Sequence, residues 1–133
     1  MTATDIPSID IHGLFTRCQG NFKLAMMLLG SLESTGRHQA EDILRHSCQD
    51  NLTAAAEIAH SLKGAAGILC AEPLRLIAAQ IEQSGREGDH GTLKAAAPNL
   101  LVEMDRCLAR INEIRAAVTQ PGIVQSVPPS TVL

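Results

Sequence analysis

The chain has 133 residues and a formal net charge of −3, which fits one domain with a single core. Apolar residues make up 45% of it and aromatic residues only 2%, a composition that favours helices over strands. The Lys and Arg residues are scattered singly, which argues against nucleic-acid binding, and no apolar run approaches the roughly 20 residues that span a bilayer.

The chain also shows no sign of export or of a metal site. Its first residues lack a basic region followed by an apolar run, so we expect no signal peptide and a cytoplasmic location. The cysteines form no C-x-x-C pair, and we expect free, buried thiols at Cys18, Cys48, Cys70 and Cys107. No two histidines lie three or four residues apart, so we predict no bound metal.

The N-terminal third predicts two helices. Residues 1–8 show little pattern and are expected to be a leader, and a short amphipathic helix then runs from residue 9 to about Gly20. Asn21 can cap a second helix. Its apolar face consists of Phe22, Ala25, Met26, Leu29 and Leu32. The pattern leaves open whether this helix continues through Gly36 or breaks there and resumes.

A helix over residues 52–69 has the most regular pattern in the chain. Its apolar residues recur at alternating spacings of three and four, which predicts a continuous buried stripe. The stripe consists of Leu52, Ala55, Ala59, Leu62, Ala66 and Leu69, and we expect Ile58, Ala65 and Ile68 to widen it.

The C-terminal half predicts two more helices. Pro is tolerated in a first helical turn, so Glu72-Pro73 indicates the start of a helix, and we expect its loop at residues 85–91. A last helix should run from about Thr92 to Val118 with Pro98 in its early turns, and residues 120–133 are expected to be a flexible tail. Residues 9–119 should therefore form one all-α domain, an antiparallel up-down four-helix bundle with a short extra N-terminal helix.

The face opposite the stripe of the 52–69 helix is unusually bare. It carries Thr53, Ala56, His60, Gly64 and Gly67, with Lys63 at its edge. A solvent-facing strip usually holds long polar side chains, and each interior glycine costs about 1 kcal/mol of helix stability relative to Ala. We therefore expect another molecule to approach this strip closely.

The strip has the residues for phosphoryl transfer. An exposed neutral imidazole is a nucleophile near pH 7, and Gly64, one turn beyond His60, removes the side chain that would block in-line approach. Lys63 can stabilise the transferred oxygens as a point charge. Phosphoryl transfer requires little beyond positioning and electrostatics. Taken singly, the imidazole, the ammonium group and the glycines all have ordinary structural explanations, and only their combination favours this chemistry.

The segment Ala59-His60-Ser61-Leu62-Lys63-Gly64, continuing to Leu69, resembles the signature of histidine-containing phosphotransfer (HPt) domains. The resemblance extends over about residues 9–118 and includes Gly20-Asn21, Leu28-Leu29 and Ile81-Glu82. It departs at Cys70, where the family usually has Gly, and this departure could alter the following turn.

The resemblance implies a phosphocarrier without autonomous catalysis. His60 would accept a phosphoryl group from the phospho-aspartate of a receiver domain and pass it to another receiver domain, in response regulators or hybrid sensor kinases. Lys63 and Gly64 match the family's positions for phosphate stabilisation and steric clearance. The chain would need no cofactor of its own, because the receiver supplies Mg²⁺, and we expect a monomer that does not touch the membrane.

An alternative is a docking-only module that binds a receiver or kinase without carrying phosphate. It would use the same strip, and in either case we expect Ala56, Ser61 and Gly67 to contact the partner. An enzyme acting alone is disfavoured, because the sequence has no glycine-rich nucleotide loop and no acidic residue at a spacing that suggests contact with His60.

Overall fold

The computed structural model describes residues 6–119, which form five α-helices and no strand. The predicted all-α class is therefore confirmed. The helices are α1 Ile11–Arg17, α2 Phe22–Cys48, α3 Leu52–Ile68, α4 Glu72–Glu87 and α5 His90–Thr119. The predicted tail at 120–133 and the first five residues of the predicted leader lie outside the described residues.

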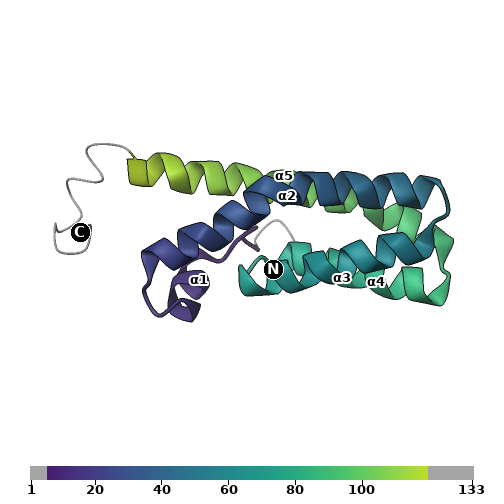
Figure 1. Ribbon diagram of the computed structural model, residues 1–133, viewed down its shortest axis with the longest axis horizontal. Coiled ribbons are helices and arrows are strands. Elements are labelled where there is room, and N and C mark those ends of the chain that lie inside the picture. Colours follow the sequence, from purple (N-terminus) through teal and green to yellow (C-terminus); the bar gives the residue numbers. More distant parts are fainter. Residues whose placement is uncertain (1–5, 120–133) are drawn as a thin grey trace.

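The four long helices pack in a closed ring. α2 contacts α3 and α5, and α4 also contacts α3 and α5. Figure 1 shows α2 lying along α5 and α3 lying along α4, with the short α1 at the end of the molecule where α2 begins. The core lies inside this ring, and its largest fully buried side chains include Leu29, Ile43, Leu62, Leu74, Ile81, Leu93, Leu100 and Met104.

The second helix does not break at Gly36. α2 begins after Asn21, whose side chain accepts a hydrogen bond from Leu24 N at 3.0 Å, and it continues to Cys48. Gly36 is buried, and a Cβ at this position would lie 2.7 Å from Met104 Sδ of α5. The glycine therefore allows α5 to approach α2 closely and does not end the helix.

The stripe of α3 is buried as predicted at Ala55, Ala59, Leu62 and Ala66, and Leu69 just beyond the helix is buried as well. Leu52 at its start is half-buried. The prediction that Ile68 widens the stripe is wrong, because Ile68 is 48% exposed. It lies in the last turn of α3, where it lines an open surface hollow.

The turn between α3 and α4 contains a residue in the left-handed conformation. Cys70 has a φ of 56°, a conformation that glycine adopts without steric cost. Its carbonyl accepts a hydrogen bond from Asp10 N at 2.9 Å, which joins the segment before α1 to this turn. Cys70, the predicted departure, therefore adopts this left-handed conformation itself.

The turn between α4 and α5 lies within the loop predicted at residues 85–91 but is shorter than predicted. α4 continues to Glu87 and ends at Gly88, which has a φ of 73°, and α5 already begins at His90. Gly85 is a packing residue, since a Cβ there would lie 2.8 Å from both Ala56 Cβ and Leu52 O of α3. Two glycines that suggested a loop thus lie inside helices, Gly85 in α4 and Gly91 in α5.

Candidate functional site

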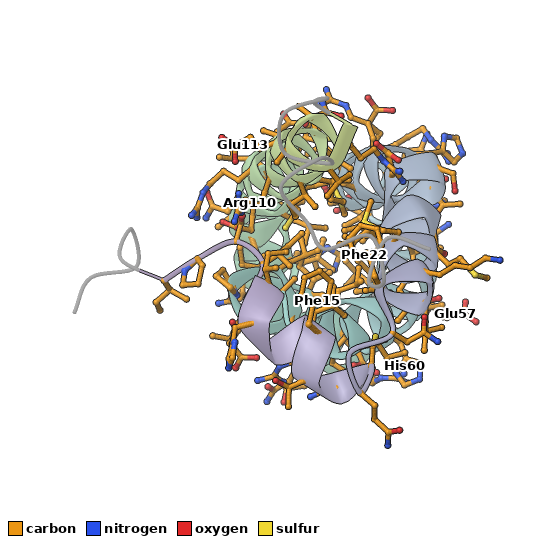
Figure 2. The ribbon with its side chains drawn as sticks, turned by 90° about the vertical axis from the view of Figure 1, so that its left-hand side faces the viewer. Phe15, Phe22, Glu57, His60, Arg110 and Glu113 are labelled. Atoms are coloured by element: carbon orange, nitrogen blue, oxygen red, sulfur yellow. The ribbon has the colours of Figure 1, made fainter. Side chains whose placement is uncertain are left out.

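His60 lies in the middle of α3 on the outside of the helix ring. Its side chain is 63% exposed, in agreement with the predicted solvent-facing position. Figure 2 looks along the bundle and shows His60 at its outer edge. Phe15 of α1 and Phe22 of α2 pack against each other elsewhere, with their ring centroids 5.9 Å apart. A second protein can therefore reach the imidazole without any rearrangement of the core.

A carboxylate from α4 contacts the imidazole. His60 Nδ1 lies 2.7 Å from Glu82 Oε2, and Lys63 Nζ lies 2.6 Å from Glu82 Oε1. Arg86 NH2 also donates to Glu82 Oε2, at 2.9 Å. The expectation that no acidic residue meets His60 is therefore wrong. One carboxylate on the neighbouring helix joins the predicted nucleophile to two cations.

Glu82 is ionised and firmly held. Its side chain is only 10% exposed, yet hydrogen bonds from Lys63, Arg86 and His60 lower the pKa of Glu82 to about 2, with Lys63 the largest contributor and burial acting in the opposite direction. A neutral imidazole that donates its Nδ1–H to this carboxylate has its lone pair on Nε2. No residue within 6–119 forms a hydrogen bond with Nε2.

Packing among residues 6–119 does not explain Gly64. A Cβ at this position would meet no atom within 4 Å, and the residue is exposed. Alanine would therefore fit and would favour the helix. The space over this turn, next to His60, is open to another molecule.

The other residues of the predicted strip differ in their solvent exposure, although the periodicity placed them all on the open face. The placement of Ala56 on the open face is wrong, because Ala56 is only 3% exposed and packs against Gly85 of α4. Ser61 is exposed, whereas Gly67 is half-buried. The carbonyl of Gly67 accepts a hydrogen bond from Arg17 NH1 of α1 at 2.9 Å. The open strip is therefore centred on His60 and Gly64 and ends near Gly67.

A shallow surface hollow continues from the strip toward α1. Its lining combines the edge of the strip with residues of α1, the α3–α4 turn and α4, and includes Arg17, Lys63, Gly64, Ile68, Cys70 and Arg75. Arg75 is held by two hydrogen bonds to Glu72, at 2.7 and 2.6 Å. The hollow thus adjoins the site but does not include the imidazole.

Sequence reasoning missed Glu82 and Arg86, although a signal for both was present. The turn that joins α3 to α4 lies at residues 69–71, so residues at similar distances on either side of it come to the same level of the helix pair. His60 lies ten residues before Cys70 and Glu82 twelve residues after it. Arg86 lies one helical turn beyond Glu82 on the same face.

Two further structural findings concern residues 6–119. No group of three or more His, Cys, Asp or Glu side chains is arranged to hold a metal ion there. None of the helices in this part of the chain combines the length and the apolar character needed to cross a membrane.

Comparison with known proteins gives one result. A family model described as "Hpt domain" matches residues 27–120, which includes His60, Lys63, Gly64 and Glu82. Searches of curated proteins and of solved structures find no match.

Proposed function

The chain belongs to the Hpt domain family, and from this premise we propose that it is a phosphorelay intermediate in which His60 accepts a phosphoryl group from a receiver-domain phospho-aspartate and passes it to another receiver. The observation that carries this proposal is the 63% exposed imidazole whose Nδ1 lies 2.7 Å from the Glu82 carboxylate. This contact favours the tautomer in which Nε2 is the nucleophile.

In the proposed transfer, the Nε2 lone pair attacks phosphorus while the bond from phosphorus to the aspartyl oxygen breaks. The electron pair of that bond returns to the receiver's carboxylate. The imidazole becomes positively charged as the new bond forms, and Glu82 stabilises that charge through Nδ1–H. The reverse reaction follows the same path, so one geometry serves both acceptance and donation.

Lys63 and Gly64 have complementary roles in this proposal. Lys63 Nζ, held beside His60 by Glu82, is close enough to move to the phosphoryl oxygens as they arrive. The open space at Gly64 leaves room for the receiver's phosphoryl-bearing loop. Mg²⁺ is expected in the receiver's acidic pocket, where it would neutralise charge during transfer.

We also infer the family's overall arrangement for this chain. The four long helices would be the antiparallel bundle, with α1 as an additional short helix. The protein would act as a cytoplasmic monomer that meets receivers through a transient interface, with Ser61 and Gly67 at its contact surface.

The test is phosphotransfer from a panel of phosphorylated receiver domains to the native chain and to His60→Gln. The native chain should gain an acid-labile, base-stable phosphate, and the variant should gain none. Because His60 is exposed, the substitution should change the free energy of unfolding by less than about 1 kcal/mol. A native chain that binds receivers but is never labelled would contradict the proposal and support docking alone.

A further inference from the structure

Two basic side chains differ from all others in the described residues. Every Lys and Arg within residues 6–119 forms an ion pair with a carboxylate, except Arg17 and Lys23. Arg17 is the last residue of α1, and Lys23 is in the first turn of α2. The unpaired positive charge of this part of the chain is therefore concentrated at the junction of α1 and α2.

Arg17 is also positioned next to the phosphotransfer site. Its NH1 donates to Gly67 O, 50 residues away in sequence, at 2.9 Å. This bond holds the guanidinium at the end of the open strip, in the hollow that is also lined by Lys63 and Gly64. The remaining N–H groups of Arg17 have no hydrogen-bond partner within residues 6–119. A guanidinium that is already held in place loses less conformational entropy when it binds a carboxylate.

The other charged groups of the hollow already have partners. Arg75 is bound to Glu72 by two hydrogen bonds. Lys63 is bound to Glu82. Asp10 accepts a hydrogen bond from Gly13 N at 3.0 Å. Arg17 is therefore the cation of this hollow that lacks an acidic partner, and it lies next to Ile68, which is 48% exposed.

Arg17 lies outside the part of the chain that the family model matches, which begins at residue 27. We propose that Arg17 is a specificity-determining contact that pairs with a surface carboxylate of the receiver domain when the receiver docks over His60. This inference rests on the proposed function. A charge at the rim of an interface mainly changes the association rate and the choice of partner, so Arg17 selects among receivers without taking part in the chemistry.

The experiment compares Arg17→Gln with Lys23→Gln in transfer from the receiver domain that labels the native chain fastest. Both variants remove one unpaired positive charge, but Lys23 does not line the hollow. Arg17→Gln should raise KM by roughly 3- to 10-fold at low salt and leave kcat within about twofold, whereas Lys23→Gln should change KM by less than about twofold. The difference between the two variants should shrink as ionic strength rises.

Equal KM values for the two variants would overturn the inference, as would a loss in kcat alone. A charge exchange gives a second test. Arg17→Glu should be rescued by a receiver in which one acidic residue of the docking face is replaced by Lys, and the absence of rescue across every such acidic position would also overturn it. The proposed function fails in a different way, because the native chain would then remain unlabelled by every receiver.

Discussion

At the scale of single residues, Glu82 connects all the charged groups of the site. One largely buried carboxylate accepts from His60, Lys63 and Arg86, and the shortest contact with each of them is 2.9 Å or less. Such a carboxylate determines the tautomer of the imidazole and also neutralises the two cations while no phosphate is present. Phosphorylation of His60 would bring new negative charge to Lys63 in competition with Glu82.

Replacement of Glu82 by Gln should change how stability depends on pH. The pKa of Glu82 in the folded chain is about 2, below its ordinary value of 4.5, so its ionised form favours folding. Its contribution is complete above pH 4.5 and is lost as pH falls toward 2. Glu82→Gln should therefore unfold with a shallower loss of stability over this range than the native chain, measured by urea unfolding at a series of pH values.

Glu72→Gln serves as the matched control for that experiment. Hydrogen bonding to Arg75 also lowers the pKa of Glu72, but this carboxylate is half exposed and has no contact with His60. Substitution of Glu72 should therefore reduce the loss of free energy of unfolding at low pH by less than substitution of Glu82 does. Parallel pH curves for the native chain and Glu82→Gln would contradict the assignment of Glu82 as a strongly held carboxylate.

At the scale of helices, the glycines of the α3–α4 pair serve different purposes. Gly85 lets α4 lie close to α3, since a Cβ there would be 2.8 Å from a backbone oxygen of α3. Gly64 faces open space on the outside of the same helix pair. The first is needed for the close packing of α4 on α3, whereas no contact within residues 6–119 requires the second.

Alanine substitutions at these two glycines should therefore have opposite effects on stability. Gly64→Ala should raise the free energy of unfolding by up to about 1 kcal/mol through helix propensity. Gly85→Ala should lower it by about 1–3 kcal/mol, because the backbone of α3 must move away. Thermal and urea unfolding followed by circular dichroism measure both values.

In phosphotransfer the order of the two variants should be reversed, so that the more stable variant is the slower one. Under conditions in which both are folded, Gly64→Ala should accept phosphate at least about tenfold more slowly, because its methyl group stands in the approach path. Gly85→Ala should retain a rate closer to that of the native chain. A stabilised Gly64→Ala variant with an unchanged transfer rate would show that the open space has no role in approach.

At the scale of the whole molecule, the cysteine thiols differ in how deeply they are buried. Cys18 and Cys107 are buried as predicted, but the expectation of burial is wrong for Cys48, which is exposed at the end of α2. Burial, with the negative charge of Glu103 nearby, raises the pKa of Cys107 to about 12. The Cys107 thiol is therefore protonated and shielded while the bundle is folded.

The reaction of these thiols with a disulfide reagent should consequently occur in separate phases. Cys48 should react at once in the native protein at pH 8. Cys107 should react only through unfolding, so its rate should rise with urea in proportion to the unfolded population. Mass spectrometry of peptides quantifies each site, and rapid native labelling of Cys107 would contradict its place in the core.

Properties that depend on neighbours along one helix were predictable from the sequence. Helical periodicity alone places His60, Lys63 and Gly64 together on the outer side of α3 and the buried stripe on the inner side, and the structure agrees on the exposure of His60 and Gly64. The predicted cap at Asn21 is equally local, since its side chain accepts from a backbone N–H three residues ahead.

Contacts between helices required the folded chain, because their spacing in sequence depends on turns and on how closely the helices approach. The burial of Ala56 depends on Gly85, and the lowered pKa of Glu82 depends on Lys63 and Arg86. Arg17 reaches Gly67 across 50 residues. Periodicity describes one helix in isolation, so it could identify His60 as the candidate nucleophile. The contact of the Glu82 carboxylate with this imidazole depends on how α4 packs beside α3, which only the tertiary structure shows.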